Sequence, residues 1–222
     1  DSLDHAQDQL RFRFAALLDD LEQLARNSLV VNAFVDSSGR ELYLFATLRD
    51  FRAPFGLAHT LVLLDSNLSV FAQAGRDAQL SPFEAEKARA AILSGKLQLA
   101  FVEAGQRMQL LIAVPAYYPP ASSYEGVFLA TMAATELIEP ALRGLPATEC
   151  LSVGVGGRTL VSTPCDATHE DGQLSAQVGI AGKAQGDVAL TVTFADTTAR
   201  PFRLLSLIAA VYAALAVLAL LL

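Results

Sequence analysis

Residues with catalytic potential are few in this sequence, and they do not form a known catalytic pattern. The three histidines, His5, His59 and His169, lie in different segments, and the chain contains neither a G-x-S-x-G nucleophile turn nor an H-E-x-x-H zinc motif. Residues 179–184 (GIAGKA) approach a phosphate-binding loop, but the glycine spacing is wrong and the final alanine has no hydroxyl for magnesium. We therefore expect no catalytic residues, no metal site and no cofactor in this segment.

The two cysteines are the other residues with reactive side chains. Cys150 and Cys165 enclose a segment that is typical of a β-hairpin with a two-residue turn at Gly156 and Gly157. In such a hairpin the two cysteines come close together, so a disulfide is feasible and would indicate an oxidising compartment. The alternative is a pair of unbonded buried thiols.

A long apolar segment ends the chain. Positions 204–222 read LLSLIAAVYAALAVLALLL and contain no charge, proline or glycine. A helix of this length extends roughly 28 Å, which is close to the hydrocarbon thickness of a bilayer. We predict a transmembrane helix that leads to a cytoplasmic part; the alternative is a fully buried core helix.

Two opposing signals bear on which side of the membrane the rest of the chain occupies. Arg200 and Arg203 precede the apolar segment and, taken alone, favour a cytoplasmic location under the positive-inside rule. A disulfide between Cys150 and Cys165 favours the opposite side, because cytoplasmic thiols are kept reduced. We expect residues 1–200 to face the periplasm or the cell exterior, anchored in a bacterial inner membrane.

The first segment, from Ser2 to Arg26, has the pattern of a long amphipathic helix. Its apolar residues follow a seven-residue repeat: Leu3, Leu10, Phe14, Leu17, Leu21 and Leu24. This period is typical of a coiled-coil seam, which predicts a homodimer through this helix, weakened by Leu17→Glu without loss of the folded sheets. The alternative is that the stripe packs on the helix's own domain, and both remain open.

The middle of the chain predicts an α+β fold. A stretch of loop and short helix reaches residue 58, and a later helix begins at the capping box Ser81–Glu84 and ends near Gly95. The predicted strands cover residues 59–64, 69–74, 96–102, 106–114 and 125–133. This order, two strands, a helix and three strands, is typical of a PAS-like antiparallel sheet with helices packed on one face.

A second, smaller sheet is predicted after a short helix at 136–142 and a Gly-Leu-Pro linker at 144–146. Its four strands cover residues 151–155, 158–161, 174–180 and 188–194. We therefore divide the chain into a long helix (1–28), a larger membrane-distal module (29–145), a smaller membrane-proximal module (146–199) and the transmembrane helix (204–222).

The charge of the chain excludes one class of partner. The formal net charge is −7, and no basic face is available to meet the phosphates of a nucleic acid. Nucleic acid is therefore not an expected partner.

Two segments carry a resemblance to a known family. Residues 24–51 (LARNSLVVNAFVDSSGRELYLFATLRDF) combine the end of the long helix with the loop that follows it. Residues 110–142 (LLIAVPAYYPPASSYEGVFLATMAATELIEPAL) combine a strand ending in proline and aromatics with a glycine-led apolar strand. Both resemble the double Cache sensors of bacterial chemoreceptors, sensor histidine kinases and diguanylate cyclases, and the layout of that family spans nearly the whole chain.

The resemblance implies that the larger module binds a small molecule between its sheet and the loops that cover it. Arginine can hold a carboxylate through two parallel hydrogen bonds and tyrosine supplies an apolar wall with a polar tip, so a small carboxylic acid or amino acid is the expected ligand. The chain departs from the family's amino-acid-binding pattern in having no tryptophan. The implied ligand-binding residues are Tyr43, Arg49, Arg52, Tyr117, Tyr118 and Tyr124.

The function implied by the resemblance is a signal-input domain. Ligand occupancy would bias the membrane helix and reach a cytoplasmic output domain, such as a diguanylate cyclase or a histidine kinase. The alternative from another class is a membrane-tethered envelope module that binds a second protein. A membrane-anchored hydrolase is a third hypothesis, and it lacks the nucleophile and base that such an enzyme needs.

Overall fold

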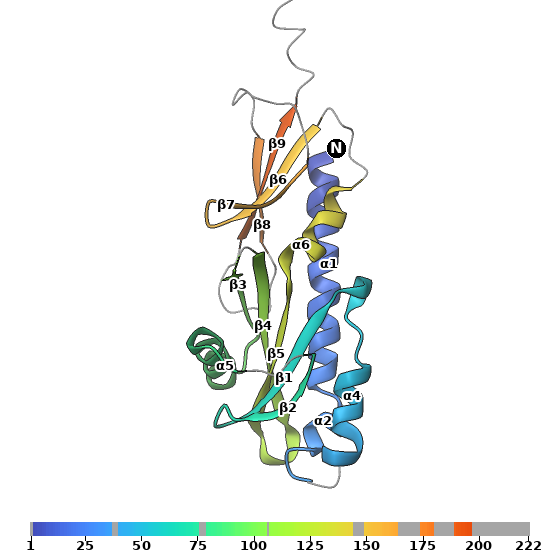
Figure 1. The fold of residues 1–222 in the computed structure, drawn as a ribbon, viewed down its shortest axis with the longest axis vertical. Coiled ribbons are helices and arrows are strands. Elements are labelled where there is room, and N and C mark those ends of the chain that lie inside the picture. The colour runs from blue at the N-terminus through green and yellow to red at the C-terminus, as the bar shows by residue number, and fades with distance from the viewer. Residues whose placement is uncertain are drawn as a thin grey trace, which may run out of the picture.

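The protein is described by a computed structural model that covers residues 2–36, 40–75, 79–105, 107–143, 149–163, 174–179 and 189–196. Within these residues, the chain forms a long helix beside two antiparallel sheets (Figure 1). The α+β class predicted from the sequence is confirmed. The predicted transmembrane segment 204–222 lies outside the described residues, and no helix in the described part is both long and apolar enough to cross a bilayer.

The long helix α1 (Ser2–Ala25) packs its apolar stripe on the sheets of its own chain (Figure 1). Leu10 and Leu17 are fully buried, and Phe14 and Leu21 are at most 2 % exposed. Of the two alternatives that the heptad pattern left open, packing on the helix's own domain is therefore confirmed. The predicted coiled-coil seam is wrong as a dimer contact, because these side chains already lie in the core of one chain, and a dimer through α1 would have to use its outer face.

Short helices follow α1, as the sequence predicted. Asn27 caps α2 (Ser28–Asn32), its side-chain oxygen accepting from the Leu29 backbone N–H at 2.9 Å. The π-helical turn η1 (Arg40–Leu44), helix α4 (Phe45–Asp50) and the 3-10 turn η2 (Pro54–Gly56) complete this segment.

The larger sheet has the strand order β2-β1-β5-β4-β3, and every neighbouring pair is antiparallel. The strands are β1 (His59–Asp65), β2 (Val70–Ala74), β3 (Gln98–Ala104), β4 (Arg107–Tyr118) and β5 (Ser123–Ala133). All five strands lie close to their predicted ranges, and β1–β2 and β3–β4 form hairpins. The strand predicted over 106–114 extends further than expected, because β4 continues through Pro115 on its β5 side as far as Tyr118.

Helix α5 (Pro82–Ser94) confirms the sequence-based capping box. The Ser81 hydroxyl accepts from the Glu84 N–H at 3.2 Å, and the Glu84 carboxylate accepts from the Ser81 N–H at 2.8 Å. Its end is also as predicted, with Gly95 in the left-handed conformation at φ 65°.

Helices cover both faces of the larger sheet, which corrects the prediction that they pack on one face. Side chains of β4 alternate between Leu110, Ile112 and Val114 on the α1 side and Leu111 and Ala113 on the α5 side. Helix α5 contributes Ala88 and Ala91 to this second, smaller core, opposite α1 (Figure 1). The strand is apolar on both faces, so each face needs a covering layer.

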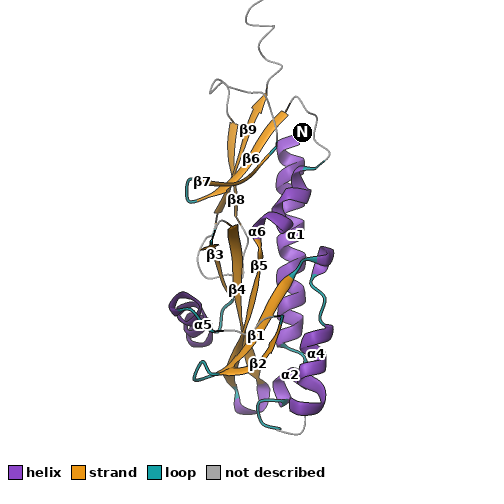
Figure 2. Ribbon diagram, viewed as in Figure 1, coloured by secondary structure: helices purple, strands orange, loops and turns teal. Residues whose placement is uncertain are grey.

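The smaller sheet has the order β7-β6-β9-β8 and follows the short helical segments α6 (Ala134–Ile138) and η4 (Glu139–Leu142). Its strands are β6 (Glu149–Val155), β7 (Arg158–Ser162), β8 (Leu174–Gly179) and β9 (Ala189–Asp196), close to the predicted ranges (Figure 2). The β6–β7 hairpin turns at Gly156 and Gly157, as predicted, and both have positive φ.

The two sheets share one apolar core along α1. Val153, Val178 and Val192 of the smaller sheet belong to the same buried cluster as Leu10 of α1 and Ile112 of the larger sheet. Helix α1 contacts β4 and β5 of the larger sheet and β8 and β9 of the smaller one, and it lies beside both sheets in the view of Figures 1 and 2. The boundaries 1–28, 29–145, 146–199 and 204–222 predicted for separate modules therefore stay a prediction.

Candidate functional site

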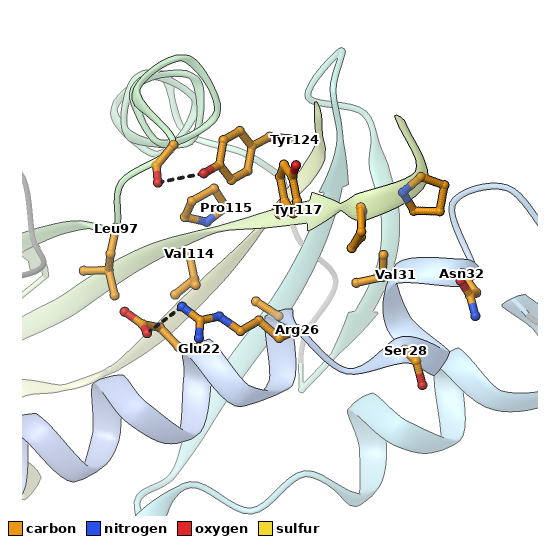
Figure 3. Close-up of a pocket in the computed structure, with 14 residues that line it drawn as sticks. Glu22, Arg26, Ser28, Val31, Asn32, Leu97, Val114, Pro115, Tyr117 and Tyr124 are labelled. Carbon is orange, nitrogen blue, oxygen red and sulfur yellow. Dashed lines mark hydrogen bonds and ion pairs between the residues drawn. The ribbon is translucent and has the colours of Figure 1, made fainter. Parts of the chain in front are cut away.

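A pocket of about 740 Å³ lies at the edge of the larger sheet, where the end of β4 approaches the last turn of α1 (Figure 3). Helix α1 contributes Glu22, Ala25 and Arg26 to its lining, and α2 contributes Ser28, Val31 and Asn32. The other walls come from the turn after α5, the end of β4 and the start of β5.

Unequal strand pairing explains why space remains at this edge. Strand β4 pairs with β5 as far as Tyr118, but it pairs with β3 only as far as Ala113, opposite Gln98. Among the described residues, the stretch from Val114 to Tyr118 therefore has a strand neighbour on one side only. The pocket occupies the other side of this stretch.

Two tyrosine rings form an aromatic wall of the pocket. Tyr117 and Tyr124 face each other across the β4–β5 pair, with ring centroids 5.2 Å apart and planes at 61°. The Tyr124 hydroxyl donates to the Gly95 carbonyl oxygen at 3.3 Å. This bond directs the polar tip of Tyr124 towards the turn after α5 and leaves its ring as an apolar surface.

A charged pair from α1 forms the opposite wall. The Arg26 Nη2 atom donates to the Glu22 Oε2 atom at 3.4 Å, one helical turn apart. The two side chains differ in exposure: Glu22 is 12 % exposed and Arg26 is 77 % exposed. The carboxylate thus lies inside the pocket wall, beside Leu97 and Val114, while the guanidinium reaches solvent (Figure 3).

Comparison with known proteins identifies the fold. No protein-family model and no curated protein matches the chain in sequence. In structure it is similar to the periplasmic domain of Vibrio cholerae LuxQ, at 14 % identity over 88 % of this chain and 96 % of that one, with a TM-score of 0.54. The ligand-binding domain of the Campylobacter jejuni chemoreceptor Tlp3, in complex with L-valine, is 9 % identical over 88 % and 93 %, with a TM-score of 0.56.

A third neighbour is the ligand-binding domain of the Pseudomonas fluorescens chemoreceptor CtaA in complex with L-leucine, at 14 % identity over 89 % and 90 % of the two chains and a TM-score of 0.54. The first is a periplasmic domain, and the other two are ligand-binding domains of chemoreceptors. The chain has the fold that these domains share. The resemblance stated from two sequence segments is therefore confirmed at the level of the fold.

The fold brings together only part of the predicted ligand-binding set. Tyr117 and Tyr124 line the edge pocket, whereas Tyr118 lies at the end of β4 and is not part of its lining. Tyr43 lies on η1 and is 51 % exposed. Whether any of these tyrosines binds a ligand stays a prediction.

The two predicted arginines lie away from the pocket. The Arg49 Nε atom donates to the Asp50 Oδ1 atom at 3.3 Å, and both side chains are largely exposed. Arg52 donates to the carbonyl oxygens of Arg49 and Phe51, at 2.8 and 2.9 Å. Arg49 therefore pairs with a neighbouring carboxylate and Arg52 with local backbone, and neither lines the pocket.

Apolar side chains fill the region between the sheet and the segment that covers it, where the sequence predicted the ligand. Leu44 and Leu48 are buried there, and the rings of Phe34 and Phe71 lie 4.9 Å apart. A Cβ atom added at Gly126 would come within 2.5 Å of the Phe34 ring. The pocket described above lies at the edge of the sheet and not on this face.

Sequence reasoning missed Glu22 and Arg26, which sit within the predicted helix. The available signal was their i,i+4 spacing in the turn just before Asn27, which starts α2. That signal is ordinary on a helix, because such pairs are common on solvated faces. Only the end of the β3–β4 pairing shows that this turn lines a cavity.

The predicted disulfide involves one described residue. Cys150 lies on β6 and is 9 % exposed, and the described part of the chain contains no free thiol. Cys165 lies outside the described residues, so the Cys150–Cys165 bond stays a prediction.

Proposed function

We propose that this chain is the extracytoplasmic sensing domain of a bacterial membrane receptor and that it binds a small molecule in the edge pocket. The observation that carries the proposal is a pocket of about 740 Å³ in a sensor fold, lined by the last turn of α1 and the unpaired edge of β4. This volume is in the range of small-molecule sites, and the mix of apolar walls with a few polar groups is typical of them.

The proposal includes the place of the chain in the receptor. Residues 1–200 face the periplasm, 204–222 span the inner membrane, and ligand occupancy passes through that helix to a cytoplasmic output domain. The chain itself is not an enzyme. The periplasmic domains among its structural neighbours support this location. A homodimer formed by the outer face of α1 would suit such a receptor.

A second candidate function is a membrane-tethered module that binds another envelope protein. One observation favours it: the segment from α2 to α4 exposes large apolar side chains. They are Leu29, Val35, Leu42, Tyr43 and Phe45, all at least 45 % exposed. Large apolar side chains that are exposed to water can serve as contacts for a second protein.

Thermal-shift measurements on the purified chain in detergent test the sensing proposal. Small acids, amino acids, amines and nucleobases serve as probes, and a ligand at 100 times its Kd should add about 2.7 kcal/mol of stability. Ser28→Trp fills the pocket from the exposed start of α2, and Ser66→Trp in the β1–β2 turn is the matched control. We expect one probe class to raise the melting temperature in the control and not in Ser28→Trp.

Two results would contradict the proposal. One is the absence of a shift with every probe class. The other is a shift of equal size in Ser28→Trp, which would place the ligand elsewhere.

A further inference from the structure

We infer that the turn η2 (Pro54–Gly56) is a strap with two positions. In this structure the strap is docked, with the Phe55 ring against Arg13 of α1, and in the second position it is released, with the ring in solvent. The turn lies between α4 and β1 and does not line the edge pocket, so the inference does not depend on a ligand there.

Backbone strain at Phe55 is the first argument. Phe55 has φ 61° and ψ 15°, which places it in the left-handed region. In that region the Cβ atom of an L residue crowds its own backbone, and the conformation is unusual for a residue with a bulky ring. Strained residues of this kind are found at segments that switch, because the surrounding contacts have to outweigh the cost. The docked turn therefore has an unstrained alternative.

The weakness of the ring contacts is the second argument. The Arg13 guanidinium lies 4.1 Å from the centre of the Phe55 ring, and the Phe12 ring lies 6.0 Å away at an angle of 63°. Phe12 is 61 % exposed and Phe55 is 44 % exposed, so water reaches both rings. At exposed sites such contacts contribute a free energy of the same order as the strain at Phe55. The docked and released positions are therefore close in free energy.

Hydrogen bonds and core packing add little to the docked position. The Leu57 N–H donates to the Pro54 carbonyl and the Ala58 N–H to the Glu136 Oε2 atom, both at 3.4 Å, which is long for such bonds. The Phe55 ring belongs to neither hydrophobic cluster of the described residues. Release of the turn therefore leaves the core closed.

Fixed residues on both sides limit the movement to the turn. Ala53 and Leu57 are each 5 % exposed and belong to the main core. Arg13 is held by a second contact, because its Nε atom donates to the Leu137 carbonyl at 2.8 Å. The anchor formed by α1 and α6 thus stays in place when the ring leaves it.

The strap connects two parts of the fold when it is docked. It joins the segment that precedes β1 to α6, through Arg13 and through the Ala58–Glu136 bond. Helix α6 in turn contacts β7 of the smaller sheet. The position of the strap therefore decides whether the start of β1 is tied to the helix that leads to the smaller sheet.

Fluorine NMR on the full chain in detergent tests the strap. 4-Fluorophenylalanine is introduced at position 55, and relaxation by a soluble nitroxide reports how far the ring is open to solvent. Gly56→Ala adds a Cβ atom at φ 68°, with nothing within 4 Å of it, and so disfavours the docked turn through its backbone conformation alone. We expect the ratio of released to docked turn to rise at least about fivefold, with stronger nitroxide relaxation of the fluorine signal.

A second variant and two controls accompany Gly56→Ala. Arg13→Gln removes the cation under the ring and should also increase the nitroxide relaxation. Arg11→Gln, at an exposed residue of the same helix, and Gly105→Ala, with φ 64° and open space at another turn, should leave the signal unchanged. Unchanged relaxation in either Gly56→Ala or Arg13→Gln would show that the ring has one position and would overturn the inference.

The Arg13 Nε–H resonance shows whether the movement is local. It should persist in Gly56→Ala, because the bond to the Leu137 carbonyl does not involve the turn. Loss of this resonance together with exposure of the ring would mean that α1 and α6 separate, and a strap on a fixed anchor would then be wrong.

Discussion

Arg158 on β7 forms an ion pair with Glu103 on β3, and this pair joins two sheets that have no strand in common. Both residues lie next to hairpin turns, at Gly157 and at Gly105. Their side chains are 61 % and 54 % exposed, so water screens the interaction. The contact between the sheets at this point is therefore polar, in contrast to the apolar core along α1.

We expect this ion pair to make a small, salt-sensitive contribution to stability. Arg158→Glu should lower the free energy of unfolding by about 0.2–1 kcal/mol, because exposed pairs are weak, and the swap Glu103→Arg/Arg158→Glu should recover it. Urea denaturation of all four combinations gives the coupling energy. Arg107→Glu, which changes the net charge by the same amount as Arg158→Glu, is the control for the effect of charge reversal without loss of the pair. A coupling energy that does not change between low and high salt would contradict a screened ion pair.

Substitution of Leu17 should unfold the protein. Leu17 is completely buried in the core that α1 shares with both sheets, so Leu17→Ala should cost about 2–5 kcal/mol and Leu17→Glu more. Ala15→Glu lies on the exposed face of the same helix and should leave stability nearly unchanged. Circular dichroism during urea titration measures both. Intact sheets in Leu17→Glu with loss of dimers, as the heptad pattern predicted, would show that the seam faces a second chain.

Substitution of Gly95 should disturb the pocket as well as the fold. An added Cβ would lie 2.5 Å from the Tyr124 ring, in a backbone conformation with φ 65° that costs an L residue about 1 kcal/mol or more. Gly105→Ala is the matched control, because it has φ 64° and open space around its Cβ. We expect Gly95→Ala to lose more free energy of unfolding than Gly105→Ala. The excess should disappear when Tyr124 is replaced by alanine, and an unchanged excess would rule out the ring contact as its cause.

Arg13 should stabilise the middle of α1 in a way that lysine cannot reproduce. Its Nε atom donates to the Leu137 carbonyl at 2.8 Å, and its guanidinium lies 4.1 Å from the centre of the Phe55 ring. Burial, and then the nearby positive charge of Arg143, lower the pKa of Arg13 from its ordinary value. Arg13→Ala should lower the free energy of unfolding by about 1–3 kcal/mol, through the lost hydrogen bond and ring contact.

Arg13→Lys should restore little of this loss, because an ammonium lacks the planar donor group that stacks on a ring. Arg11→Ala, at an exposed residue paired with Asp8, is the control for removing a positive charge from the same helix. Full recovery in Arg13→Lys, measured by urea denaturation, would contradict a role for the guanidinium plane.

Local signals in the sequence were enough to predict most elements. The capping box at Ser81 and the Gly156–Gly157 turn act within a few residues, so their geometry follows from the residues present. The apolar repeat of α1 predicted the helix but not its partner, because Leu17 is equally suited to a second helix and to a sheet. Burial by the chain's own sheets is a long-range outcome that this pattern does not contain.

The candidate site was harder to predict because strand register creates it. The candidate ligand-binding residues were arginines and tyrosines chosen by residue type. Two of them, Tyr117 and Tyr124, line the pocket. The cavity exists because β3 pairs with β4 only as far as Ala113, whereas β5 pairs with β4 as far as Tyr118. The residues around Glu22 and Arg26 in the sequence do not predict where this pairing ends. Register is set by the packing of whole strands.

Helix α1 places a stiff rod between the cavity and the smaller sheet. Its last turn forms a wall of the pocket, and its first half packs against β8 and β9 without a loop or a break between. At 1.5 Å per residue the rod is about 36 Å long, and a hydrogen-bonded helix resists compression along its axis. A ligand that displaces the last turn of α1 would therefore also displace the part of the helix that contacts β8 and β9.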